Sequence, residues 1–295
     1  MNYMNQSFEL SRWLMLVSKH WSENRKKYTL SLIAMAGLLL LWFIFALVLS
    51  ARPMDEGTQL GTYYFGLFVV GCLYASMLFA DLASKSKGIN YLAIPASHLE
   101  KLLCILFYGV IVFFISYTLI FYLVDVPMVE LSNAIAYSHW QKIHIPGTTF
   151  DHGKVMNVFV MPAEGRNAPE PFYYFVLAYF AVQAAFIFGS VYFPKFSFIK
   201  TVITLLLVGL FFTFFVGKVL QEILPPGSFY KGITSYRVFH METIGTGGTS
   251  ITSDATDKLV SLPGWIEDVL IFVLKYAFAP IFWVITYYRL KEKEI

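Results

Sequence analysis

Charged residues are scarce in this chain, and so are cysteines. Only 14% of the residues are Asp, Glu, Lys or Arg, whereas soluble domains average about 25%. Hydrophobic residues make up 57% and the mean hydropathy is +0.61, which excludes an ordinary soluble domain. The two cysteines, Cys72 and Cys104, lie inside long apolar runs, where we expect them to pack as small apolar residues. A disulfide framework is therefore not expected.

The sequence also lacks the motifs of several enzyme classes. It has no Gly-x-x-x-x-Gly-Lys-Ser/Thr phosphate loop, because the glycine-rich segment 244–249 lacks the lysine. No Ser/His/Asp arrangement is visible, and the apolar runs lack the residues of an intramembrane protease. We therefore expect a protein that is not an enzyme and that does not hydrolyse ATP by the P-loop route.

Long apolar runs are what the chain has in abundance. Each of six runs is close to the ~20 residues that a helix needs to cross a bilayer core. No signal-peptide cleavage pattern precedes the first run, so we expect it to remain as a span. The pattern predicts an all-α polytopic membrane protein, a single transmembrane domain with six helices. The runs are Leu30–Ser50, Tyr63–Ala80, Leu102–Val124, Phe172–Phe193, Thr201–Leu220 and Val269–Tyr288.

The distribution of basic residues orients these spans. With the N-terminus in the cytoplasm, thirteen of the 22 lysines and arginines fall on the inner side, eight fall outside, and Lys275 lies within a span. This bias follows the positive-inside rule and predicts that both termini are cytoplasmic, in an inner (cytoplasmic) membrane. Two long loops, 125–171 and 221–268, then face outside. Because orientation explains the net charge of +3, no nucleic-acid partner is expected.

Two segments on the predicted cytoplasmic side have specific patterns. Residues 7–27 mix tryptophan and leucine with basic residues, which is typical of an amphipathic helix lying in the membrane interface. A frayed basic tail is the alternative. In the link 81–101, Ser97 and Glu100 have the spacing of a capping box, so a helix should begin at Ser97 and continue into the third span.

A few polar residues within spans or loops are candidates for chemistry. Lys275 lies in the sixth run, where it either snorkels to the interface or contacts cargo or a neighbouring helix. Gln183, in the fourth run, can hydrogen-bond to a neighbouring helix. His139, His144 and His152 lie close together in the first external loop, and imidazole is a zinc ligand. Their spacing fits no standard metal site, so an ordinary loop surface is the competing interpretation.

The whole pattern resembles the permease subunit of an ABC-type exporter of the type-2 superfamily. The segments Ser7–Lys27, Asp81–Lys101 and Gln221–Asp268 match in position the interfacial helix, the cytoplasmic coupling loop and the external segment of that family. The stretch Tyr91–Lys101 also resembles the Leu-Pro-Ala-Ser-x-x-Glu-Lys segment of Bacteroidetes-type permease-like membrane proteins, with Ile94 in place of the leucine. The loop 125–171 is longer than is usual in compact members of the family.

The resemblance implies a function and a set of partners. The chain would be the membrane-spanning subunit of an exporter, and a separate ABC ATP-binding subunit would bind ATP and magnesium. The chain would pair with itself or with a similar permease. Alternatives are a scaffold or sensor that acts through its external loops, and a membrane enzyme with its site in the histidine-containing loop. The residues implied in coupling are Ile94, Pro95, Ser97, Glu100 and Lys101.

Overall fold

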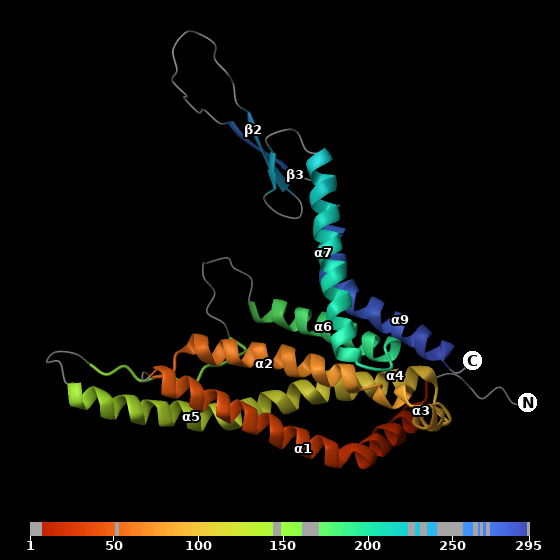
Figure 1. Cartoon of the computed structure of the whole chain (residues 1–295), viewed down its shortest axis with the longest axis horizontal. Coiled ribbons are helices and arrows are strands. Elements are labelled where there is room, and N and C mark those ends of the chain that lie inside the picture. Colours follow the sequence, from red (N-terminus) through yellow and green to blue (C-terminus); the bar gives the residue numbers. More distant parts are fainter. Residues whose placement is uncertain are drawn as a thin grey trace, which may run out of the picture. The chain divides into compact units, whose positions relative to one another are not determined.

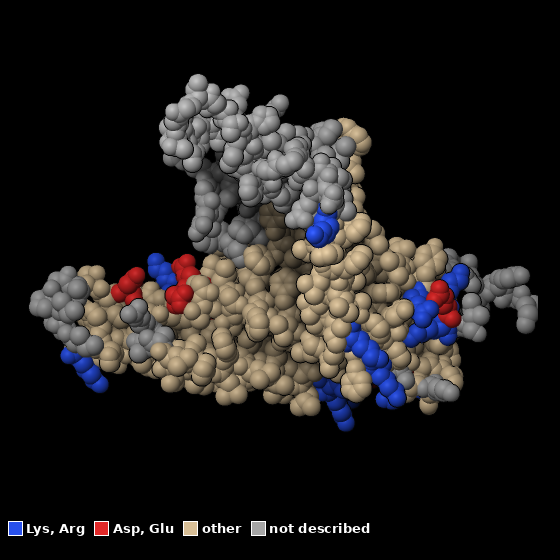
Figure 2. All heavy atoms as spheres, turned by 45° about the horizontal axis from the view of Figure 1, so that its top comes forward, with Lys and Arg blue, Asp and Glu red and all other residues tan. Residues whose placement is uncertain are grey.

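The computed structural model describes residues 8–50, 53–143, 149–160, 171–223, 228–230, 235–240, 256–261, 265, 268–269 and 272–293. The chain divides into two compact units. The first comprises Met1–Thr201 and Ala279–Ile295, and the second comprises Val202–Phe278. Among the described residues, five helices are long and apolar enough to cross a membrane, so the chain is a multi-pass membrane protein. Most of the surface seen in Figure 2 is uncharged, as lipid contact requires.

The first unit begins with α1, Leu10–Ser50, a helix of 41 residues. The predicted interfacial helix 7–27 and the first span are therefore parts of one helix, because no proline or glycine interrupts the chain between them. Next come α2 (Glu56–Met77), the 3-10 turn η1 (Ala80–Ala83) and the short helix α3 (Lys85–Leu92). Figure 1 shows the N-terminal part of α1 beside α3 and α4.

The third span is longer than the sequence predicted. Helix α4 (His98–Leu106), the π-helical segment η2 (Phe107–Val112) and α5 (Phe113–Ile143) follow one another without a break. The predicted external loop 125–171 therefore begins as helix, and Pro127 lies inside that helix. The helix continues because its buried face continues, with Val124, Met128, Val129, Ser132 and Ala136 all buried. Further along the predicted loop, residues 154–160 form neither helix nor strand.

The core of the first unit lies among α2, α5 and α6 (Pro171–Tyr192). Its largest buried side chains are Tyr63, Tyr117 and Tyr179, and the hydroxyls of the last two donate hydrogen bonds to backbone carbonyls of neighbouring helices. Tyr117 Oη donates to Tyr63 O at 2.9 Å, and Tyr179 Oη donates to Val110 O at 3.1 Å. Gly66 permits this packing, because a β-carbon there would clash with the Tyr117 hydroxyl. Buried phenols thus find partners, as burial of polar groups demands.

Helix α7 (Ser197–Ile223) leads from the first unit into the second. The second unit holds a three-stranded antiparallel sheet of β1 (Ser228–Tyr230), β2 (Ser235–His240) and β3 (Thr256–Ser261). Tyr230 pairs with Tyr236, and Ser235 with Ser261. The all-α prediction was therefore incomplete, because this sheet lies in the segment 221–268 that was taken as a loop. Aromatic and β-branched residues in β2 favour the strand.

The sixth predicted run, 269–288, is described only in part. It contains the π-helical turn η3 (Val273–Ala277) and helix α9 (Phe278–Glu292). It is not one of the five helices that qualify as spans among the described residues. Helix α9 packs in the first unit, where Lys293 Nζ donates to Val191 O at 2.6 Å and Phe282 contacts Phe188.

Candidate coupling site

The capping box predicted at Ser97 is present and begins α4. Ser97 Oγ accepts from Glu100 N at 3.2 Å, and Ser97 N donates to Glu100 Oε2 at 2.8 Å. Pro95 lies two residues earlier and is exposed. Because the cap satisfies backbone groups that the first helical turn leaves free, it fixes where α4 begins relative to the preceding loop.

Glu100 does more than cap its own helix. Its carboxylate is fully buried and accepts from Arg12 Nε at 2.8 Å, from Arg12 Nη2 at 2.7 Å and from Glu9 N at 2.9 Å. Burial alone would raise the pKa of Glu100, which precedes the apolar run of the third span. The hydrogen bonds from Arg12 and from two backbone amides outweigh burial and lower the pKa to about 2. Glu100 is therefore ionised near neutral pH.

Lys101 is held on the opposite side of the same loop. Its side chain is 2% exposed, and Nζ donates to Leu92 O, the last residue of α3, at 2.8 Å. The ammonium also lies 5.9 Å from the centre of the Tyr91 ring. Lys101 therefore fastens the end of α3 to the start of α4. We call Arg12, Ser97, Glu100 and Lys101 the Glu100 cluster.

An apolar contact beneath this cluster joins α1 to α4. Leu16, Cys104 and Tyr108 form a buried group, against which Ile94 and Val17 are packed. Tyr108 Oη donates to Val17 O at 2.9 Å. The structure thus brings together the two segments that were singled out separately in the sequence, residues 7–27 and residues 81–101.

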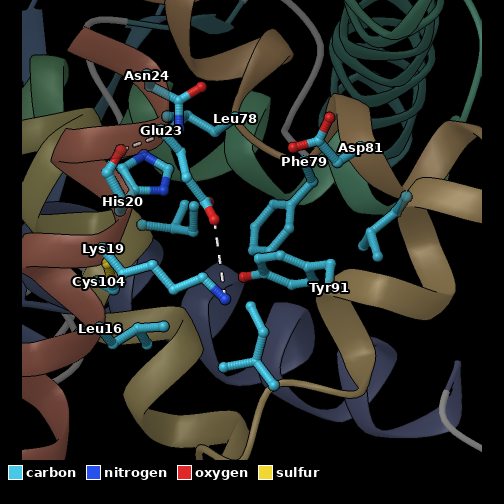
Figure 3. A pocket seen from close by; sticks show the side chains of 13 residues that line it. Leu16, Lys19, His20, Glu23, Asn24, Leu78, Phe79, Asp81, Tyr91 and Cys104 are labelled. Atoms are coloured by element: carbon cyan, nitrogen blue, oxygen red, sulfur yellow. Dashed lines mark hydrogen bonds and ion pairs between the residues drawn. The ribbon is translucent and has the colours of Figure 1, made fainter.

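A small cavity separates α1 from η1 and α3. Figure 3 shows Lys19, His20, Glu23 and Asn24 of α1 on one side, with Asp81 and Tyr91 on the other. Lys19 Nζ lies 3.8 Å from a Glu23 oxygen, and His20 Nε2 is 2.6 Å from the Tyr28 hydroxyl. Its volume of about 40 Å³ is enough for one or two water molecules rather than a substrate. The cavity is a small gap between α1 on one side and η1 and α3 on the other.

The exposed surface of the segment 81–101 is not formed by the charged residues at its end, Glu100 and Lys101. Glu100 and Lys101 are among the residues that the resemblance implies in coupling, but both are buried, so neither side chain lies at the surface of the loop. The exposed residues of the segment 81–101 include Lys87, Ile89, Pro95 and Leu99. Ile89, in α3, is 67% exposed.

Gln183 and Lys275 lie in different units. Gln183, in α6, is buried, and neither of its amide atoms has a hydrogen-bond partner among the described residues. It packs on Gly71 of α2, where a β-carbon would clash with its Nε2. Lys275 lies in η3 of the second unit. Gln183 is therefore enclosed by helices, as expected, but the predicted hydrogen bond to a neighbouring helix is not found among the described residues.

The predicted histidine group is only partly described. His139 is exposed on α5, and His152 is exposed in the segment 149–160, where its ring lies 4.8 Å from that of Phe150. His144 lies outside the described residues. Within the residues that the structure describes, no group of three metal-ligating side chains is found.

Two polar features escaped the sequence analysis. Arg12 was counted only as a basic interfacial residue, although a buried acid at the third position of α4 required a cation nearby. Gln59 binds the backbone of the segment after α5, donating to Lys154 O at 2.9 Å and accepting from Met156 N at 2.8 Å. No sequence signal pointed to that contact, because its partners are backbone groups about 95 residues away.

The comparisons with known proteins add no family to this geometry. No protein-family model matches the chain, and neither a curated protein nor a solved structure does.

Proposed function

We propose that the chain is the membrane-spanning subunit of an ATP-driven ABC exporter, coupled through residues 81–101 to a separate ATP-binding subunit. The observation that carries the proposal is the Glu100 cluster. It joins the predicted coupling loop to the N-terminal part of α1 through a buried ion pair and a capping box. The sequence resemblance to type-2 ABC permeases supplies the identity of the partner.

The geometry suits the transmission of a movement. A partner that pushes on α3 moves Leu92, which is bonded to Lys101, and hence the start of α4. Helix α4 continues through η2 into α5, and Glu100 carries the same displacement to α1. Rigid helices joined in this way respond together, which is what alternating access by rigid-body motion requires.

The remaining parts of the proposal follow from charge and hydropathy. Six spans with both termini in the cytoplasm agree with the excess of basic residues on that side. The partner subunit would hold ATP and magnesium, and a second permease, identical or similar, would complete the translocation path. The loops 125–171 and 221–268 would face outside an inner membrane.

The test is purification of the tagged full-length chain from its native membrane in mild detergent, with mass spectrometry of whatever co-purifies. A stoichiometric P-loop ATPase is the expected result. The exposed Ile89→Asp substitution should then reduce both co-purification and coupled ATPase activity, because an apolar side chain exposed at an interface is replaced by a charge. Ile199→Asp is the matched control, since Ile199 is 55% exposed in the other predicted cytoplasmic link.

Two results would contradict the proposal. The first is a clean preparation without an ATPase, because the proposed exporter requires an ATP-binding subunit. An ATPase that responds equally to Ile89→Asp and Ile199→Asp removes α3 as the coupling element, even if the complex is real.

A second function, that of a non-transporting scaffold or sensor, is favoured by one observation at the opposite end of α2 and α5. Residues 149–160 are held there by Gln59, Tyr122 and Asn133, whose side chains bond to backbone groups of Gly153–Val158. A loop with defined structure can present a binding surface. Co-purification of an envelope protein in place of an ATPase, lost on replacing Asn133 by Leu, would establish this alternative.

A further inference from the structure

A second cavity lies between α1, α4, η2, α6 and α9. Its volume is about 340 Å³, within the lower range of pockets that hold small ligands. All of its lining residues are apolar, among them Phe8, Trp13, Leu106, Ile111, Phe180 and Trp283. The part of the lining between Leu103 and Ile111 extends over about 12 Å of helix at 1.5 Å per residue. One wall of the cavity therefore follows the axis of the helix that crosses the membrane.

We propose that this cavity binds one acyl chain of a membrane glycerophospholipid. The chain is a multi-pass membrane protein, so lipid tails are the medium that surrounds these helices. An apolar lining fits a hydrocarbon chain and offers no charge to a polar substrate. The cavity is lined by Phe8 and Trp13, which belong to the predicted interfacial segment 7–27, and lipid headgroups begin at the interface where such a segment lies.

Two indole groups give the ligand an orientation. Trp13 Nε1 and Trp283 Nε1 are both buried, and neither has a hydrogen-bond acceptor among the described residues. Both rings line the cavity. An ester carbonyl at the top of an acyl chain would be an acceptor for such a donor, and tryptophan is enriched at that level of the membrane for this reason. The π-helical segment η2 displaces Phe107 and Ile111 from regular helical positions at the same place, as π-bulges at binding sites do.

The test compares two tryptophan substitutions on one helix. Ile111 lines the cavity and is 50% exposed, whereas Ile115, one turn further on, is 54% exposed and does not line it. Purified full-length protein is delipidated by detergent washing, and the retained phospholipid is counted by native mass spectrometry. Wild type and Ile115→Trp should retain about one phospholipid per chain, and Ile111→Trp should retain roughly tenfold less, because overpacking disfavours the bound state.

A second measurement tests the indole donors separately. A diester phospholipid should displace the bound molecule more effectively than its diether analogue, which lacks the carbonyls, and the difference should disappear in Trp13→Phe/Trp283→Phe. Equal retention by Ile111→Trp and Ile115→Trp would overturn the site, and so would a retained molecule that is not a phospholipid. Equal displacement by ester and ether lipids in wild type would overturn the orientation. None of these outcomes depends on an ATPase partner.

Discussion

The two ends of the α2–α5 pair are fastened by different chemistry. Near the start of α4, a carboxylate and a guanidinium join two helices, in the Glu100 cluster. Near the start of α2, the Gln59 amide joins a helix to the backbone of residues 154–156, which have no secondary structure. We call Gln59, Tyr122 and Asn133 the Gln59 cluster. Both contacts supply partners to backbone groups, but the first also pairs two opposite charges between two helices, whereas the second consists of neutral hydrogen bonds to a segment without secondary structure.

In the proposed exporter, the first contact would transmit movement between helices, and the second would maintain local structure. Removing one charge of the Glu100 cluster leaves the other charge buried and frees a helix. Removing the Gln59 side chain frees only an extended segment. The two clusters should therefore respond independently to substitution, since they share no partners.

The largest effect is expected from Arg12→Met. It leaves the Glu100 carboxylate, which is fully buried, without its ion partner, and an uncompensated buried charge costs about 3–5 kcal/mol. The unfolding temperature in detergent should fall, and the double variant Arg12→Met/Glu100→Met should recover most of the loss. Lys19→Met is the matched control, because the Lys19–Glu23 pair is exposed and should contribute less than about 1 kcal/mol. Equal losses from Arg12→Met and Lys19→Met would contradict a buried role for Glu100.

Gln59→Leu should have a smaller and local effect. The Met156 amide loses its acceptor in a buried setting, which costs about 1–3 kcal/mol. Hydrogen exchange should accelerate at Met156 while the amides of Glu9 and Ser97 stay protected, and Arg12→Met should show the reverse pattern. Gln141→Leu, at an exposed position on α5, serves as control. Simultaneous deprotection at both ends in either variant would show that the two clusters are not independent.

The sequence predicted those features whose signals are local. The Ser97–Glu100 spacing gave the cap, and five of the predicted runs correspond to helices that qualify as spans. The sequence did not predict features in which tertiary packing outweighs the local preference for a turn or helix end. A loop was predicted from residue 125 onward, but the buried face from Val124 to Ala136 continues α5 through Pro127. It also failed for the partners of Glu100 and Gln59, which lie 88 to 97 residues away and leave no periodic pattern.

Gln183 provides a third case, a buried amide between the two ends that has no partner among the described residues. Gln183→Met should raise the free energy of unfolding by about 1 kcal/mol, because it removes the cost of burying an unpaired amide and keeps the side chain flexible. The unfolding temperature of the variant is measured, together with its transport or ATPase activity, and both are compared with wild type. A more stable but less active variant would identify Gln183 as a functional polar group. A less stable variant would show that the amide has a structural partner.

The smallest expected effect is that of pH, and it separates the two clusters once more. The pKa of Glu100 is lowered from 4.5 to about 2, so its stabilising contribution is complete above pH 4.5 and is lost as the pH falls towards 2. The stability difference between wild type and Glu100→Gln should therefore be constant from about pH 5.5 to 8. At about pH 3 it should shrink, while the difference between wild type and Gln59→Leu persists, because no titratable side chain takes part in the Gln59 bonds. A change in the Glu100 difference between pH 8 and 6 would mean that this carboxyl is protonated near neutrality. The buried pair would then act as a pH-sensitive switch rather than as a permanent connection between α1 and α4.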